Sequence, residues 1–288
     1  MMFRPREGHD QRILSCDVQI SPVPARLRYV HDVFGNSVGV VGFKGRHRAL
    51  TFESSVRLEH TPASAFADLD GDMEVYTGAA PFAYSAQDLP DLAQSMQRLH
   101  PDPQGAVDQW ARRFVRPAGA TPLQTLLSEM TQAIYAEFKY SKRLEMGSQT
   151  PLQTLELRSG SCRDYAILMI EAVRSLGLAA RFVSGYIYSP HRSPSHRGRI
   201  GGGHTHAWVR VYLPACGWVE FDPTNGIVGN TDLVRVAVAR DPRQAVPLHG
   251  TWAGSPTDYL GMDVEVDVRA EIEGLGQLST PRTVAVAR

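Results

Sequence analysis

Two short stretches of alternating apolar and polar residues constrain the fold of this chain most, because they predict an antiparallel hairpin with a defined register. They are residues 206–213 and 218–221, and a turn of sequence P-A-C-G separates them. Matching their apolar faces pairs Val211 with Val219 and leaves a five-residue loop. We therefore expect a hairpin with one face turned to a buried core.

The opposite face of this hairpin carries His206 and Asp222. In the register above, Trp208 lies across from Asp222 and His206 lies diagonal to it, whereas a three-residue loop would put His206 directly across from Asp222. In both registers the carboxylate can orient the ring, stabilise its protonated form and leave the other ring nitrogen for a thiol. The alternatives are a purely structural histidine and an aspartate that begins an Asx-type turn.

A third candidate residue, Cys162, lies at the predicted start of a helix over residues 161–176. This helix is apolar nearly all round, so we expect it inside the domain. Ser161 and Asp164 have the form of a capping box with Ser161 as N-cap. A thiol in the first helical position lies near unpaired amides and the positive end of the helix dipole, which favours thiolate, although Asp164 opposes this. The alternative is a small buried cysteine that only packs.

A metal site is the minor alternative. His204 and His206 form an H-x-H pair that would place two imidazoles on one face of a strand, and His191 and His196 precede them. No second group of ligands at metal spacing accompanies them, so we predict no metal and no cofactor. Cys216 lies inside the predicted hairpin turn and is interpreted as a turn residue.

The remaining pattern predicts an α+β protein. Near the N-terminus, residues 50–58 alternate as a half-buried antiparallel strand, and residues 26–33 and 38–43 form a hairpin around the turn cluster F-G-N. Thr121 is predicted as the N-cap of a helix of about four or five turns, with Pro122 in its first turn. Further elements are expected at residues 88–99 and 106–115 as helices, and at residues 181–188, 233–239 and 262–272 as strands.

Length and composition indicate two domains, since the chain has 288 residues, of which 43% are hydrophobic. We place a β-rich domain with a helical connector at residues 1–117 and a second domain with C-terminal strands at residues 118–288. Thirty basic and thirty acidic residues give no electrostatic reason to expect nucleic acid or a membrane as a partner.

Two further features concern the compartment. The N-terminus lacks an apolar stretch behind its charges, and no run of about 18 apolar residues occurs, so we expect a cytoplasmic protein. Three cysteines, Cys16, Cys162 and Cys216, are too few and too scattered for a disulfide framework.

Four segments together resemble the transglutaminase-like superfamily, in particular its bacterial members described as cysteine proteases. They are T-P-L-Q-T-L-E-L-R-S-G-S-C-R-D-Y-A, G-L-A-A-R-F-V-S-G-Y, H-T-H-A-W-V-R-V-Y-L-P and G-W-V-E-F-D-P-T-N-G. The resemblance implies a papain-like α+β core with a helix packed on an antiparallel sheet. It also implies that Cys162 is the nucleophile and that His206 and Asp222 are the catalytic pair on adjacent strands.

The resemblance extends in both directions along the chain. Upstream, H-D-V-F-G-N-S-V and L-T-F-E-S-S-V-R-L-E-H resemble the β-rich N-terminal domain of these proteins, and downstream it reaches V-A-V-A-R-D-P-R-Q-A-V-P-L-H-G. Members usually have an additional strand pair before the position of F-R-P-R-E-G-H-D, where this chain starts. We therefore expect an exposed edge in the N-terminal sheet, which favours self-association or poor solubility.

The expected activity is attack of the Cys162 thiolate on the carbonyl of a peptide or protein amide, which forms a thioester. Water or a second amine then resolves the thioester, and the sequence leaves the choice open. The backbone N–H of Cys162 is expected to meet the oxyanion, with Tyr140 as a candidate second donor. The alternative is a module on the same fold that binds a peptide or protein without catalysis.

Overall fold

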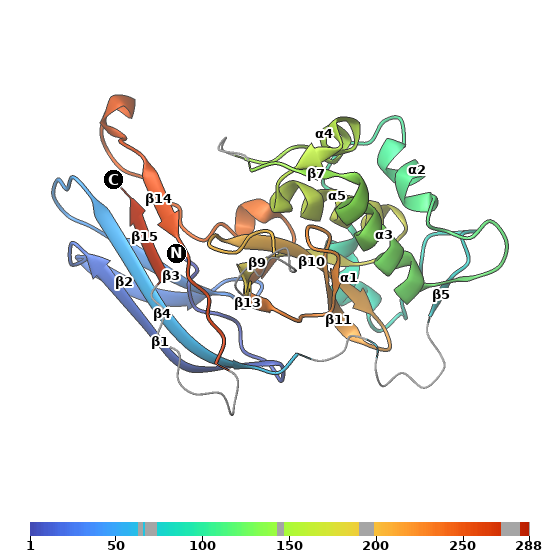
Figure 1. The fold of residues 1–288 in the computed structure, drawn as a ribbon, viewed down its shortest axis with the longest axis horizontal. Helices are drawn as coiled ribbons and strands as arrows, with labels where there is room; N and C mark the ends of the chain where they lie inside the picture. Colours follow the sequence, from blue (N-terminus) through green and yellow to red (C-terminus); the bar gives the residue numbers. More distant parts are fainter. Residues whose placement is uncertain (63–65, 67–73, 143–146, 190–198, 272–282, 288) are drawn as a thin grey trace, which may run out of the picture.

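The structure is a computed structural model that describes residues 1–62, 66, 74–142, 147–189, 199–271 and 283–287 (Figure 1). The core sheet lies in the middle of the molecule, between a group of helices on one side and a second sheet on the other (Figure 1). That core sheet contains β9 (Ala180–Ile187), β10 (His206–Leu213), β11 (Gly217–Asp222), β12 (Ile227–Val228) and β13 (Leu233–Ala239). Its strand order is β12-β11-β10-β9-β13, and every neighbouring pair is antiparallel.

The helix α5 (Cys162–Ser175) packs on β9 and β10, and the other core helices surround it (Figure 1). These are α2 (Ala106–Arg112), α3 (Leu123–Glu137) and α4 (Pro151–Leu157); α1 (Leu89–Met96) lies beside β9. From Asp164 to Arg174 every residue of α5 is buried, as predicted from a sequence that is apolar nearly all round. A helix enclosed on one face of an antiparallel sheet confirms the predicted papain-like α+β class.

The predicted hairpin register is confirmed. Val211 pairs with Val219 and Val209 pairs with Phe221, and the core buries all four side chains. Pairing continues to Leu213 and Gly217, so three residues stay unpaired instead of the predicted five. Gly217 has a φ of 70°, a left-handed conformation that glycine adopts without steric cost and that lets the strands close this tightly.

One predicted helix start is wrong. Thr121 does not cap α3, because Thr121–Pro122 forms the short strand β6, which pairs with β5 (Val75–Tyr76). The amide of Leu123, the first helical residue, donates to the Glu74 carbonyl at 3.0 Å. Strand pairing thus occupies the N–H that a side-chain cap would have satisfied.

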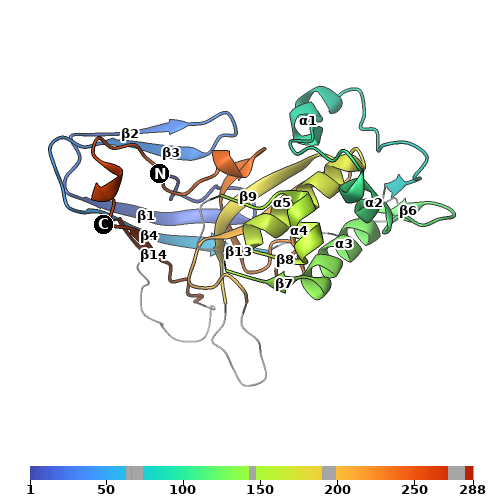
Figure 2. The ribbon, with the colours of Figure 1, turned by 90° about the horizontal axis from the view of Figure 1, so that it is seen from above.

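The second sheet combines strands from both ends of the chain. Its order is β1-β4-β15-β14, from β1 (Gln11–Ser21), β4 (Leu50–His60), β14 (Met262–Glu265) and β15 (Thr283–Ala287). The predicted hairpin is present as β2 (Arg26–His31) and β3 (Ser37–Gly42), which Figure 2 shows lying over β1 and β4. β1 is an outer strand of this sheet; self-association through the edge stays a prediction.

The C-terminal strands differ from the predicted arrangement. The strand expected at residues 262–272 ends at Glu265, where its pairing with β15 ends, and residue 272 lies outside the described residues. β14 and β15 extend the sheet of β1 and β4 and are separate from the core sheet. The predicted domain boundary between residues 117 and 118 therefore does not assign each sheet to one side of the boundary, because β14 and β15 follow it but join the first sheet. As a limit between domains, this boundary stays a prediction.

Short elements complete the chain. β7 (Lys139–Tyr140) pairs in parallel with β8 (Ser159–Gly160), directly before α5. Two 3-10 turns, Pro242–Gln244 and Pro256–Asp258, follow β13. Within the described ranges, no helix has both the length and the apolar character that crossing a bilayer requires.

A buried ion-pair network joins the N-terminal region to the core sheet. Arg235 of β13 contacts Asp10 at 2.9 Å and Glu220 of β11 at 2.6 Å, and all three side chains are at most 8% exposed. Burial raises the pKa of Asp10, but hydrogen bonding and charge from Arg235 outweigh burial and lower it from 3.8 to about 2. Asp10 therefore contributes stability above pH 3.8 that is lost as the pH falls through about 2.

We predict that Arg235→Met lowers the free energy of unfolding by about 3–5 kcal/mol, because it leaves Asp10 buried without its cation and Glu220 with Arg210 alone. Urea denaturation at pH 7 measures this loss. The control is Arg12→Met, which breaks an ion pair with Glu59 whose side chains are 72% and 56% exposed. It should cost less than about 1 kcal/mol. Equal losses in the two variants would contradict the role given to Arg235.

Candidate active site

The site is built around a hydrogen bond between His206 and Asp222. His206 is the first residue of β10 and Asp222 is the last residue of β11, so the confirmed register brings the two side chains together. His206 Nε2 lies 2.8 Å from Asp222 Oδ2, and both side chains are 0% exposed. The imidazole also stacks on the Trp208 ring with centroids 5.8 Å apart and planes at 27°. These contacts hold the ring in one orientation.

Asp222 also begins a turn, as the structural alternative proposed. Its Oδ1 accepts a hydrogen bond from the Thr224 amide at 2.9 Å, while Oδ2 faces His206 and accepts from Asn225 Nδ2 at 2.8 Å. The two interpretations of Asp222 are therefore compatible, because each uses a different carboxylate oxygen. The turn fixes the carboxylate that orients the histidine.

Cys162 occupies the first position of α5, and the predicted capping box is present. Asp164 Oδ2 accepts from the Ser161 amide at 2.8 Å and from Ser161 Oγ at 2.9 Å, and its Oδ1 accepts from the Gln149 amide at 2.7 Å. The carboxylate that was expected to oppose a thiolate thus has its charge compensated by nearby donors. The half-buried Cys162 sulfur lies at the amide end of the helix.

The second ring nitrogen of His206 is left for Cys162. Within the described residues, Nδ1 has no hydrogen bond of normal length, although it is buried. Burial lowers the pKa of His206, but the charge and hydrogen bond of Asp222, followed by the hydrogen bond and charge of Cys162, outweigh it and raise the pKa to about 10. The imidazolium is therefore the favoured form at neutral pH.

Asn225 is a site residue that the sequence analysis missed. Its Oδ1 accepts from the Ile200 amide at 2.8 Å, and its Nδ2 donates to the Ile200 carbonyl at 3.0 Å as well as to Asp222. One side chain thus ties the segment at Ile200 to the carboxylate that holds His206. The only sequence indication was the position of Asn225 three residues after Asp222, in a segment interpreted solely as a turn.

The segment at Ile200 continues over the imidazole. Gly201 has a φ of +99°, and a Cβ atom at this residue would lie 2.6 Å from His206 Nδ1. Only glycine fits here, because a side chain would both strain the backbone and clash with the ring. Residues 199–203, which contain three glycines, therefore close over the site on the Nδ1 side.

The two described histidines of the alternative metal site, His204 and His206, make contacts with different partners. His204 Nε2 lies 3.0 Å from Lys142 Nζ, whereas His206 faces Asp222. His191 and His196 lie outside the described residues. In the portion that the structure describes, no three His, Cys, Asp or Glu side chains gather at metal-binding distance.

Tyr140, the candidate second oxyanion donor, lies in β7 and pairs with Gly160 of β8, two residues before Cys162. Burial, followed by the charges of Cys162 and Asp164, raises the pKa of Tyr140 to about 12. Its hydroxyl is therefore protonated at neutral pH and can donate a hydrogen bond.

Two family models match the chain. Residues 108–223 match the transglutaminase-like superfamily, and residues 1–59 match the bacterial transglutaminase-like N-terminal region. Cys162, His206 and Asp222 all fall inside the first match. The second match ends within β4.

Relatives cover nearly the whole chain. The uncharacterized protein Rv2569c of Mycobacterium tuberculosis is 29% identical over 272 residues, which are 92% of this chain and 84% of the relative. A protein-glutamine gamma-glutamyltransferase of Pseudomonas aeruginosa is 35% identical over 69 residues, which are 24% of this chain and 10% of the relative.

A solved structure shares the fold. The crystal structure of a "putative cysteine protease" from Cytophaga hutchinsonii superposes with a TM-score of 0.64 at 16% identity, covering 99% of this chain and 90% of the other. At this identity the similarity concerns architecture alone. The two family matches carry the relationship in sequence: residues 1–59 are similar to the bacterial transglutaminase-like N-terminal region, and residues 108–223 are similar to the transglutaminase-like superfamily.

Proposed function

We propose that the chain is a Cys–His–Asp thiol enzyme that acts on amide or peptide bonds through a thioester. The observation that carries this proposal is the arrangement of His206, whose Nε2 bonds to Asp222 while its buried Nδ1 has no hydrogen-bond partner within the described residues. Cys162 is among the groups that raise the pKa of this imidazole. An oriented imidazole next to a thiol at a helix N-terminus is the arrangement that generates a nucleophilic thiolate.

In the resting enzyme, His206 as imidazolium already holds the proton of Cys162, and in the first half-reaction the Cys162 thiolate forms a bond to the amide carbonyl carbon. The tetrahedral intermediate collapses as the C–N bond breaks, and His206 returns the proton to the leaving amine. The Cys162 amide supports the oxyanion, and the protonated hydroxyl of Tyr140 is the second donor that we propose. The product bound to the enzyme is a thioester.

In the second half-reaction, His206 takes a proton from water or from an amine, which attacks the thioester carbonyl and expels the Cys162 thiolate. Water gives hydrolysis, and an amine gives acyl transfer. The Pseudomonas aeruginosa relative carries the name of a glutamyltransferase and the Cytophaga hutchinsonii structure that of a protease, so both outcomes are consistent with proteins similar to this one. We propose a peptide or protein amide as substrate and, since the net charge is zero, no nucleic acid or membrane partner.

We predict that Cys162→Ala lowers amide cleavage or transfer by roughly 10³-fold or more, because the acyl-enzyme cannot form. A panel of glutamine-containing peptides, incubated with and without a primary amine and analysed by mass spectrometry, measures both products. In the wild type, iodoacetamide at pH 7 should label Cys162 faster than Cys16 or Cys216, since burial raises the pKa of both other thiols.

The matched control is Cys216→Ala, which changes a turn residue and should keep full activity. Undiminished turnover in Cys162→Ala would rule out the proposed nucleophile. Peptide binding with no thioester detectable in the wild type would favour a binding module on the same fold instead.

We predict that Asp222→Asn lowers turnover by roughly 10²- to 10⁴-fold, because the imidazole loses its orienting partner. Burial then becomes the dominant influence on His206 and lowers its pKa, so the imidazolium is lost at neutral pH. The pH profile of turnover should therefore differ between the wild type and the variant. The same pH profile in both proteins would contradict this assignment.

We propose that Asn225 is a positioning residue that holds Asp222 and the segment at Ile200 in place. Asn225→Ala should lower turnover by about 10- to 100-fold, mainly in kcat. It should also speed labelling of Cys162 by a bulky maleimide relative to iodoacetamide, because the segment over His206 is released.

The control for Asn225 is Thr224→Val. It keeps the backbone hydrogen bond to Asp222 and removes a buried hydroxyl that has no partner within the described residues. If the ratio of maleimide to iodoacetamide labelling were the same in Asn225→Ala as in the wild type, Asn225 would contribute to stability only and would not position the segment at Ile200.

A further inference from the structure

A cavity lies at the junction of the two sheets, close to the candidate site. Its volume is about 180 Å³. Most of its walls are apolar and come from segments far apart in the chain: the N-terminus, β4, the segment after β13, and β14. Representative lining residues are Phe3, Phe52, Leu248 and Val264.

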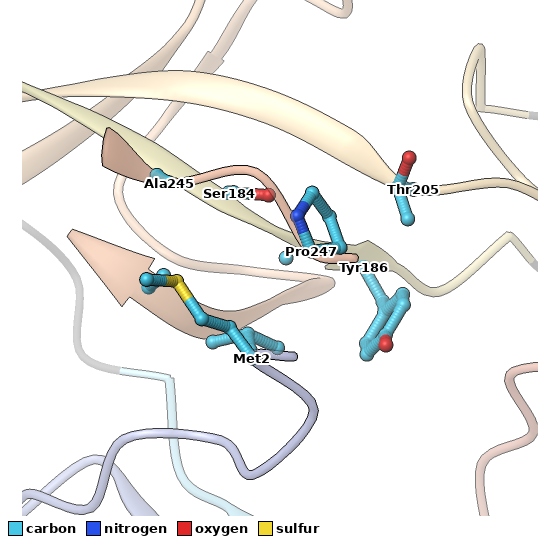
Figure 3. A pocket seen from close by; sticks show the side chains of 9 residues that line it. Met2, Ser184, Tyr186, Thr205, Ala245 and Pro247 are labelled. Atoms are coloured by element: carbon cyan, nitrogen blue, oxygen red, sulfur yellow. The ribbon is translucent and has the colours of Figure 1, made fainter. Parts of the chain in front are cut away.

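Two lining residues connect this junction pocket to the catalytic residues. Arg163 directly follows Cys162, and Thr205 directly precedes His206. Neighbouring Cα atoms are about 3.8 Å apart, so the pocket lining includes backbone positions next to Cys162 and His206. Figure 3 shows Thr205 with Tyr186 at one end of an adjoining narrow crevice, and both residues also line the pocket.

The polar groups of the junction pocket are suited to an anion. Its lining includes Arg163 but no Asp or Glu, and no described carboxylate forms an ion pair with this guanidinium. The nearest specific contact of Arg163 is the Phe182 ring, 6.0 Å away. Ser54 adds a hydroxyl that is buried, with the residue 5% exposed, and has no hydrogen-bond partner within the described residues.

We infer that the junction pocket is a substrate subsite that receives a large apolar side chain of an acyl-donor peptide, with a neighbouring carboxylate of that peptide bound by Arg163. This inference rests on the proposed function, since it places the peptide next to Cys162. A hydrophobic cavity of about 150 Å³ in another protein binds benzene, so the volume suits one phenyl or leucyl group. The guanidinium matches a carboxylate in charge and hydrogen-bonding geometry.

In this proposal, the sheet that contains the N-terminal strands forms part of the substrate subsite. Phe52 and Ser54 belong to β4 and Val264 belongs to β14, so the sheet outside the catalytic core provides one wall of the pocket. The core provides Arg163 and Thr205 on the other side. Specificity for the acyl donor therefore depends on both sheets, whereas the reacting groups come from the core alone.

Binding to the Cys162→Ala protein tests this subsite without requiring turnover. Four fluorescent capped peptides are compared, each with one glutamine. Leucine or alanine stands beside the glutamine, and each of these is combined with either glutamate or lysine. Fluorescence anisotropy should show at least tenfold tighter binding of the leucine–glutamate peptide than of the other three. Adding Arg163→Glu should reverse the charge preference toward lysine, while Arg28→Glu on β2 should leave it unchanged.

Filling the pocket gives an independent readout. Val264→Trp should abolish the preference for leucine over alanine, and Val40→Trp on β3 should preserve it. Equal binding of all four peptides, or no measurable binding of any, overturns the subsite. Selective binding by Cys162→Ala together with no turnover by the wild type would instead leave the subsite in place and reject the proposed chemistry.

Discussion

The antiparallel pairing of β10 with β11 is the constraint on which the candidate site depends. Apolar side chains on one face, among them Val209 and Phe221, lock the two strands in one register against α5. A shift by one residue would turn these side chains out of the core, so the alternative is strongly disfavoured. The same register sets the 2.8 Å contact of His206 with Asp222. Hydrophobic packing on one face of the hairpin thus determines the geometry of the polar pair on the other face.

A second constraint holds the two sheets together. Arg235 lies between Asp10 and Glu220 in a buried position, where an unpaired charge would be costly. This network fixes the N-terminal region, at Asp10, against β13 and β11 of the core sheet. The junction pocket lies between the same two bodies, so its shape depends on a cation that is remote from the reacting groups.

Local chemistry explains which features the sequence could predict. The register follows from alternation around Val211, and the cap of α5 follows from Ser161 and Asp164, since both need only neighbouring residues. Features that depend on distant segments were missed. Asn225 holds the site through hydrogen bonds with Ile200, which belongs to a separate loop. Thr121 does not cap α3, because it pairs with β5 instead. The charges of the Arg235 network appear in sequence as ordinary surface residues.

The return of the chain to its first sheet has a consequence for synthesis. Ser54 of β4 pairs with Thr283 of β15, and the complete core lies between them in sequence. During translation, β4 therefore emerges long before its second neighbour, and the first sheet remains incomplete until residues 283–287 leave the ribosome. Pairings so distant in sequence form slowly, because a long loop must close first. All five strands of the core sheet lie before residue 240, so this sheet is complete in sequence before β15 is made.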